Sequence, residues 1–286
     1  MSHRHVLQGR FSCWPTSQWA NRALRFFLEW KQDLQASWGT AKQLLQKQLA
    51  QQYRYSWLGL FWAVMPSALI ALVLMGGQQA SIRIGEISVP GAFYGVFGVA
   101  MAQTFIEAIN TSRLIFTRNQ QLFRRYKVPL DGFILAGFLE VLLNAAVRLM
   151  VVGIVFISFR IFPATQTLPL CAIGFFAVAC QGTGLGLICA PLNSLKIDFD
   201  NFFVFAPWII FAVTPVFSPL KTGSIFFVVS QKVPLTHLFE STRTAAYGGS
   251  TDPWGVIPGL VLGLFMMGTG WAFCRLARPY VIERIL

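Results

Sequence analysis

The stretch QQYRYSWLGLFWAVMPSALIALVLMGG, residues 51–77, changes character halfway along its length. It opens with glutamines, aromatic residues and Arg54, and from Tyr55 to Gly77 it contains no charged residue. An uncharged apolar run of about 20 residues is long enough for a helix to cross the hydrocarbon core of a bilayer. The stretch therefore predicts a transmembrane helix with positive charge and aromatic rings at its entrance.

The composition of the whole chain indicates that further helices of this kind follow. Of the 286 residues, 55% are hydrophobic and 12% are charged, and the mean hydropathy is +0.57. Charged residues make up about a quarter of a soluble domain, because most of its surface faces water. We therefore expect an all-α integral membrane protein.

Charge-poor segments divide the chain into six candidate spans, at residues 57–77, 91–112, 133–159, 168–192, 202–217 and 256–274. If both termini lie on one side, 17 of the 23 Lys and Arg residues lie on that side and five lie on the other, with Arg148 inside a span. Cytoplasmic connections carry the excess of positive charge. This distribution predicts a multi-pass protein with both termini in the cytoplasm.

Two regions outside the spans also have a recognisable pattern. Residues 1–55 hold no span, but the segments 19–34 and 38–53 place apolar residues at helical spacing with basic residues opposite. This pattern predicts amphipathic helices in the headgroup plane, although helices packed on a soluble partner would have the same pattern. Residues 218–255, before the last span, hold an apolar piece too short to cross a bilayer, which predicts a short re-entrant or external segment.

Polar and small residues inside the spans identify faces that pack against other helices. Glu140, Asn144 and Arg148 form one stripe on the third span. Ionisable residues at membrane depth are costly, so the stripe either lines a wet pathway or forms an interhelical cluster with Glu107 or Asn110 of the second span. Four-residue repeats of small residues predict close helix packing in the fourth and sixth spans, at Gly182, Gly186, Ala190, Gly255, Gly259 and Gly263.

Several classes of function find no support in the sequence. There is no G-x-x-x-x-G-K-[ST] nucleotide motif and no metalloprotease HExxH, and the five cysteines form no CxxC pair. We therefore expect no enzyme activity, no cofactor and no metal site in this chain. The net charge of +12 does not indicate nucleic-acid binding, because the basic residues sit at the ends of apolar runs.

Four motifs resemble one protein family when they are taken in order. The first is S-x-L-G-x-x-W-x-x-x-P, which begins at Ser56 and ends at Pro66. NQQLFRRYKVP (119–129), TPVFSP (214–219) and VPLTHLFESTR (233–243) follow it. Together they resemble the permeases of polysaccharide-export ABC transporters, the membrane subunits for O-antigen, capsule and teichoic acid. The chain departs from the family pattern at Gln52 to Arg54, where the family often has Arg-Tyr-Lys, and at Val233, where it often has Asn.

The resemblance implies a homodimer of six-span permease subunits in the bacterial inner membrane. Each subunit would dock on a separate ATP-binding subunit, so that the complex holds two copies of it, and ATP and Mg would bind in that partner. The cargo would be a lipid-linked polysaccharide moving outward, as in lipopolysaccharide biosynthesis or capsule export. The sequence leaves two alternatives open, an exporter for teichoic acid, a lipid or a drug, and a membrane assembly or lipid-modifying protein without transport.

The resemblance also assigns roles to particular residues. The loop of residues 114–132 would contact the ATPase through a short helix after an N-cap, with the residues Asn119, Leu122, Phe123, Arg124, Arg125, Tyr126 and Lys127. A solvated basic loop is the alternative. The substrate path would use Arg54 for phosphate and aromatic rings for sugars, at Tyr55, Trp57, Phe61 and Trp62, with Phe202, Phe203 and Trp208 as a facing wall. The alternative for the first group is an ordinary aromatic belt that anchors the helix.

Overall fold

The structure is a computed structural model of the 286-residue chain. It describes residues 37–50, 81–84, 87–125, 129–158, 168–195, 198–216, 225–247 and 253–285, together with Met65 and Leu69. Apart from these two residues, the first predicted span and the amphipathic segment 19–34 lie outside the described residues.

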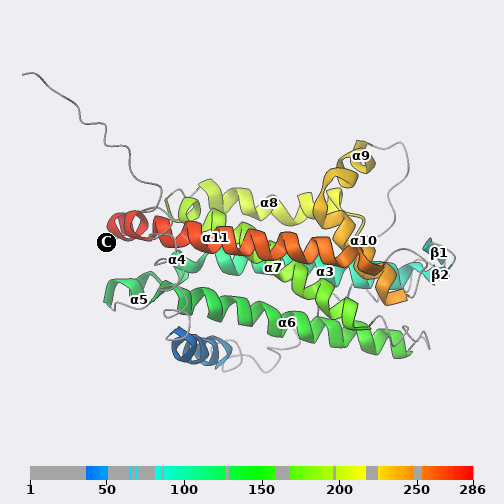
Figure 1. Cartoon of the computed structure of the whole chain (residues 1–286), viewed down its shortest axis with the longest axis horizontal. Coiled ribbons are helices and arrows are strands. Elements are labelled where there is room, and N and C mark those ends of the chain that lie inside the picture. Colours follow the sequence, from blue (N-terminus) through cyan, green and yellow to red (C-terminus); the bar gives the residue numbers. More distant parts are fainter. Residues whose placement is uncertain are drawn as a thin grey trace, which may run out of the picture.

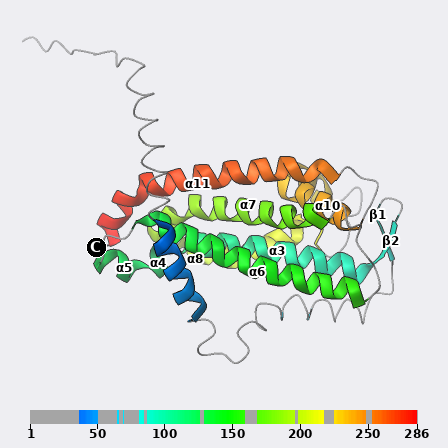
Figure 2. The ribbon, with the colours of Figure 1, turned by 60° about the horizontal axis from the view of Figure 1, so that its bottom comes forward.

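The described chain is helical apart from one small hairpin (Figures 1 and 2). The long helices run side by side along the long axis, and they are α3 (Gly91–Arg113), α6 (Leu130–Ser158), α7 (Leu168–Leu195), α8 (Asp198–Val213) and α11 (Val256–Ile285). The hairpin pairs β1 (Ser81–Ile84) antiparallel with β2 (Ile87–Pro90). The predicted helical fold is confirmed, and the hairpin was not predicted.

Shorter elements occupy the two ends of the bundle. One end carries α4 (Ile115–Arg118) and α5 (Gln120–Arg125), beside the C-terminal part of α11 (Figure 1). The other end carries the hairpin, α9 (Ile225–Lys232), α10 (Pro234–Tyr247) and a 3-10 turn at Pro253–Gly255. The described part of residues 218–255, predicted as a re-entrant or external segment, therefore consists of two helices and this turn.

Three helices are long and apolar enough to cross a membrane among the described residues, over Leu130–Ile154, Pro169–Ser194 and Val256–Val281. They correspond to the third, fourth and sixth predicted spans, which agrees with the expected membrane protein. α8 is a shorter apolar helix, and α3 covers the second predicted span but includes Gln103, Glu107 and Arg113.

The central helix of the bundle is α7, and glycines bring it close to both neighbours. A Cβ added at Gly182 or Gly186 would lie 2.7 Å from a carbonyl oxygen of α3, at Phe105 or Ile109. On another side of α7, a Cβ at Gly184 would lie 2.5 Å from the carbonyl carbon of Met266 in α11. The predicted small-residue face of the fourth span therefore packs on α3, while Gly184 permits the approach of α11.

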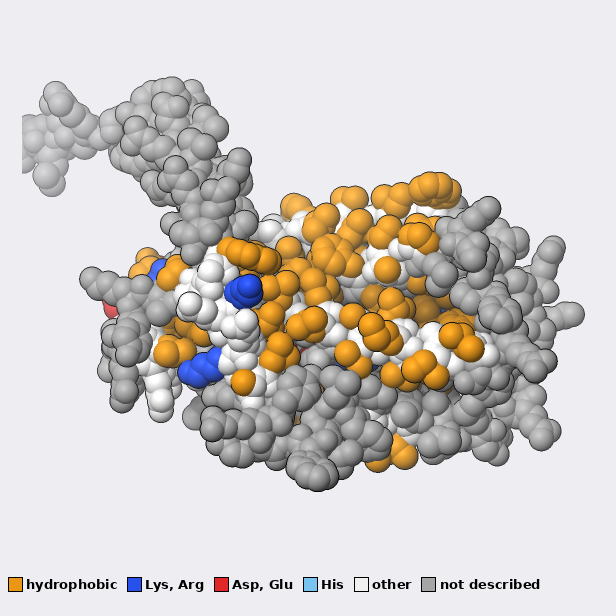
Figure 3. All heavy atoms as spheres, turned by 90° about the horizontal axis from the view of Figure 1, so that it is seen from below, with side chains coloured by type: hydrophobic (Ala, Val, Ile, Leu, Met, Phe, Trp, Pro, Cys, Tyr) orange, Lys and Arg blue, Asp and Glu red, His pale blue; other side chains and the backbone are white. Residues whose placement is uncertain are grey.

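The outer surface of the bundle is largely apolar. Large hydrophobic side chains are exposed on α6, α8 and α11, including Met150, Ile154, Phe205, Trp208, Val261 and Phe265. Where its side chains are described, the face in Figure 3 is mainly hydrophobic, and Lys and Arg side chains lie toward one end. Water disfavours so extended an apolar surface, whereas lipid chains accommodate it.

The helical segment 37–50 crosses the beginning of α6 (Figure 2). Ala41 is buried and Leu44 packs on the core, whereas Lys42 and Lys47 are exposed. The segment is amphipathic, as the sequence predicts for 38–53. Its position in the headgroup plane stays a prediction.

Candidate functional site

The residues predicted for the substrate path fall into two groups. Arg54, Tyr55, Trp57, Phe61 and Trp62 lie outside the described residues, as do the predicted coupling residues Tyr126 and Lys127. On α8, the side chains of Phe202 and Trp208 are 58% and 74% exposed, whereas Phe203 is buried. The predicted facing wall is therefore divided, because Phe203 faces the interior of the bundle.

Asn119 connects the two short helices that follow α3. Its carbonyl oxygen accepts hydrogen bonds from the backbone nitrogens of Leu122 at 3.0 Å and Phe123 at 3.1 Å. Its side-chain amide donates to the carbonyl of Ile115 at 2.9 Å. Asn119 therefore precedes α5 as expected for an N-cap residue, but its side chain closes the end of α4 instead of capping α5.

The apolar side of α5 packs against its own bundle. The ring centroid of Phe123 lies 4.8 Å from that of Phe133 in α6, and Leu122 joins the same core cluster. The exposed side chains of α4 and α5 are Thr117, Arg118 and Gln121, while those of Arg124 and Arg125 lie outside the description. A protein partner that binds this end would thus contact polar side chains, while the apolar side chains of α5 are held against α6.

The polar stripe of α6 joins α3 in the middle of the bundle. Arg148 pairs with Glu107 at 2.5 Å between Nη2 and Oε2, and its Nη1 donates to the hydroxyl of Thr104 at 3.4 Å. Asn144 donates to the other carboxylate oxygen of Glu107. Glu140, on the same stripe, is buried. Asn144 and Arg148 therefore form an interhelical cluster with Glu107, one of the two arrangements that the sequence left open.

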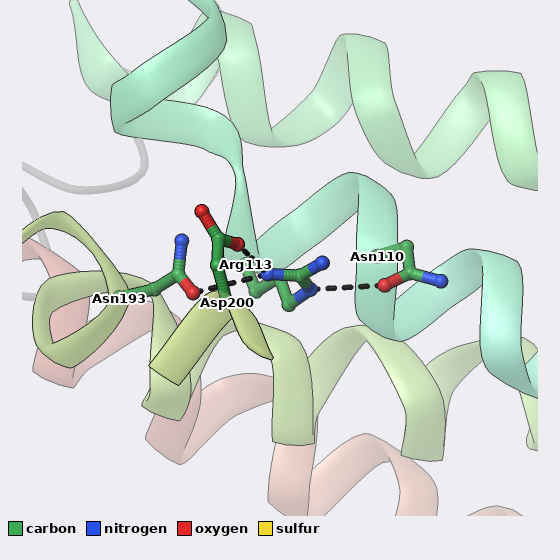
Figure 4. A network of polar contacts seen from close by, with 4 residues as sticks. All are labelled: Asn110, Arg113, Asn193 and Asp200. Carbon is green, nitrogen blue, oxygen red and sulfur yellow. Dashed lines mark hydrogen bonds and ion pairs between the residues drawn. The ribbon is translucent and has the colours of Figure 1, made fainter. Parts of the chain in front are cut away.

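A second polar network centres on Arg113 at the end of α3 (Figure 4). Its Nε donates to the side-chain oxygen of Asn110 at 2.9 Å, and its Nη1 donates to that of Asn193 at 3.0 Å. Nη1 also pairs with the carboxylate of Asp200. The guanidinium lies 4.7 Å from the centroid of the Phe203 ring, a cation–π contact. One arginine thus connects α3 with α7 and α8.

Asp131, in the first turn of α6, connects that helix to α11. Arg275 donates from Nε to Oδ1 at 3.0 Å and from Nη2 to Oδ2 at 2.5 Å, so the pair is bidentate. The indole nitrogen of Trp271 donates to Oδ1 at 2.6 Å. The side chain of Asp131 is only 3% exposed, and charge-assisted bonds of this kind fix the relative position of two helices.

At the opposite end of the bundle, Arg243 of α10 is almost completely buried, with 1% exposure. It donates to the carbonyl oxygens of Pro215 at 3.0 Å and Val216 at 3.4 Å, directly after α8. Its guanidinium lies 3.5 Å from the centroid of the Tyr94 ring in α3. Arg243 therefore fixes the other end of α8 to α3 and α10.

Sequence reasoning missed these contacts because it used the same arginines only as indicators of topology. Arg113, Arg243 and Arg275 lie near the ends of apolar runs, where a positive charge is expected in any case. The available signal was the acidic residues. The chain has only 11 Asp and Glu, so an acid near a span end, such as Asp131 or Asp200, is a candidate partner for a nearby arginine.

No family model matches the chain, and no curated protein matches it at a significant level. Within the described part of the chain, no group of three or more His, Cys, Asp and Glu side chains could hold a metal ion.

Proposed function

We propose that the chain is the transmembrane permease subunit of an ABC exporter that moves lipid-linked polysaccharide, of O-antigen or capsular type, across the bacterial inner membrane. The proposal rests on the four ordered motifs, and it is supported by an apolar helical bundle in which three described helices are long enough to cross a membrane. The active complex would contain two copies of this chain and two ATP-binding subunits. ATP and Mg would bind in those partners, because this sequence lacks a nucleotide motif.

The observation that carries the proposal is the construction of α4 and α5. They lie between two long helices, α3 and α6, at one end of the bundle. Their exposed side chains are polar and their apolar side chains are held on α6, through the contact of Phe123 with Phe133. Such an element can receive a displacement from a partner protein and pass it to the bundle. Its apolar side chains are closely packed on α6, so they cannot move without moving that helix.

Contacts at the same end extend this connection to the other long helices. Two residues before the Phe133 contact, Asp131 joins α6 to α11 through Arg275. Arg113, the last residue of α3 and two residues before α4, joins α3 to α7 and α8. A movement of α4 and α5 would therefore reach every long helix of the described bundle through side chains in direct contact.

The test is co-purification of the chain with a candidate ATP-binding subunit from the same organism, followed by ATPase assays in liposomes. Arg118→Glu combined with Gln121→Glu changes the exposed face, and we expect at least a tenfold loss of bound ATPase, since a reversed charge at an interface costs more than about 1.4 kcal/mol. Phe123→Ala combined with Arg124→Ala should keep part of the ATPase binding but reduce the stimulation of ATPase activity by substrate, because α5 loses its aromatic contact with α6.

The matched control is Lys232→Glu combined with Gln231→Glu, which makes the same changes of charge at two exposed positions of α9, at the opposite end. It should alter neither binding nor stimulation. Retention of the ATPase by the doubly charged variant would place the contact elsewhere on the chain. Stimulation by a different lipid, but not by the glycan-linked one, would favour the alternative cargo, and the absence of any ATPase partner would favour a membrane protein without transport.

A further inference from the structure

Arg113 and Asp200 form an ion pair whose two members differ in exposure. The side chain of Arg113 is 10% exposed and that of Asp200 is 45% exposed. A buried guanidinium keeps its charge and needs an anion beside it. The carboxylate of Asp200 can leave into water at little cost, because much of it is already hydrated. The cation is therefore fixed in place, while its counter-ion is exchangeable.

The site also offers more hydrogen-bond donors than Asp200 uses. Only one carboxylate oxygen, Oδ1, bonds to Arg113, and the other points away from the guanidinium in Figure 4. The side-chain nitrogen of Asn193 is buried and bonds to no other group, while the side-chain oxygen of the same amide accepts from Arg113. Asn193 as a whole is only 5% exposed, and a buried donor without an acceptor is costly in a finished site.

The chemistry of the missing acceptor follows from these donors. A phosphate group has three or more oxygens in a tetrahedral arrangement, so it can accept from the Arg113 guanidinium and from the Asn193 amide together. It carries more charge than a carboxylate, and arginine pairs with it through parallel hydrogen bonds. The Phe203 ring, at 4.7 Å, and the Asn110 oxygen hold the guanidinium in position for such an exchange.

We infer that Arg113 and Asn193 bind a phosphate group carried by a lipid at the end of the bundle that holds α4 and α5, and that this group displaces Asp200. The inference deepens the proposed export function and rests on it only for the physiological lipid, since the binding itself requires no ATPase subunit. Departure of Asp200 breaks the ion pair that joins α8 to α3. Loading of the lipid would thus remove one of the two contacts between Arg113 and α8, while the Phe203 ring still holds this end of the helix and Arg243 holds the other.

The experiment measures equilibrium binding of phosphorus-32-labelled polyprenyl phosphate to the purified full chain in phosphatidylcholine nanodiscs. Asp200→Asn removes the competing carboxylate and keeps its shape, so we expect binding about tenfold tighter. Asn193→Asp places a negative charge where the amide donor stood, and Arg113→Gln removes the cation. Both should weaken binding about tenfold or more. Glu283→Gln, an exposed acid on α11, controls for the gain in net charge and should leave binding within about twofold.

Opposite effects of Asp200→Asn and Asn193→Asp are the decisive result. A purely structural ion pair predicts no such opposition in phosphate binding, because loss of Asp200 or a second acid beside Arg113 would then change only the stability of the fold. Size-exclusion profiles identify any variant that fails to fold. The comparison needs only Asp200→Asn and Asn193→Asp, which both keep the shape of the side chain. Equal or parallel effects of the two variants on phosphate binding would overturn the inference.

Two further probes separate the sources of the phosphate. Phosphatidylglycerol in the nanodisc tests an ordinary headgroup, and inorganic phosphate in the buffer tests a soluble anion. If either probe shows the same opposite dependence on positions 200 and 193, the phosphate site is supported and that probe is assigned as its ligand. If phosphate binds but no ATPase subunit associates, the site stands and the export function fails. If the ATPase associates and export proceeds while no probe depends on Asp200, only the site fails.

Discussion

Three ion pairs among the described residues each join two different helices. Glu107–Arg148 joins α3 to α6, Arg113–Asp200 joins α3 to α8, and Asp131–Arg275 joins α6 to α11. Buried pairs contribute little net stability, because the cost of removing both charges from water offsets most of their attraction. Their effect is to exclude other registers between the helices, since a shifted helix would leave a charge unpaired in an apolar interior.

The pair of Glu107 and Arg148 gives a direct measure of this effect. We expect Glu107→Gln to lower stability by about 3–5 kcal/mol, because Arg148 is then a buried charge without its partner. Arg148→Met should cost less, because the side chain of Glu107 is more exposed than that of Arg148 and the carboxylate left behind is better hydrated. The double variant should recover most of the loss. The measurement is thermal unfolding in detergent, with the exposed Arg118→Gln as the control. Losses that simply add in the double variant would contradict a coupled pair.

The helices themselves could be predicted from apolar runs, but their neighbours could not. The fifth predicted span reaches residue 217, whereas α8 ends at Val213, because Pro215 has no backbone N–H to continue the helix. Gly182 and Gly186 indicated one packing face of the fourth span, but Gly184 was not recognised as part of a second face. Among the site residues, the sequence identified Glu107 as a possible partner of the α6 stripe. It did not predict the contacts of Asp200 and Arg243, because these contacts depend on how close helices that are remote in sequence lie to one another.

Close approach of α7 and α11 at Gly184 gives a prediction about a pair of elements. Gly184→Ala would place a Cβ 2.5 Å from the carbonyl carbon of Met266, so the two backbones must separate. We expect a loss of about 1–3 kcal/mol, the usual cost of overpacking, measured as a lower midpoint of thermal unfolding. The matched control is Gly268→Ala on α11, where an added Cβ meets nothing within 4 Å. There the greater helix propensity of alanine should leave stability unchanged or raise it by up to about 1 kcal/mol. Equal effects at the two positions would mean that the helices are not in close contact.

The described chain as a whole has polar groups at both ends and an apolar outer surface between them. One end holds α4, α5, the helical segment 37–50 and the contacts of Arg113 and Asp131. The other end holds the hairpin, α9, α10 and the buried Arg243 (Figure 1). An apolar band between two polar ends is the arrangement that a bilayer requires when helices run across it. The long axis of the bundle would then stand across the membrane.

This arrangement predicts which exposed positions react with a water-soluble thiol reagent. In a background without the five native cysteines, Glu240→Cys on α10 should react with an impermeant maleimide in intact spheroplasts, and Gln121→Cys on α5 only after the membrane is disrupted. The direction follows from the excess of Lys and Arg on the side of α5.

Met150→Cys is the control, because its position on α6 is 69% exposed yet lies on the apolar surface. In lipid a thiol stays protonated and out of reach of the reagent, so this variant should react in neither condition until the protein is unfolded. Reaction of Gln121→Cys from outside would invert the topology. Reaction of Gln121→Cys and Glu240→Cys from the same side, or of Met150→Cys in intact membranes, would mean that the bundle does not cross the bilayer along its long axis.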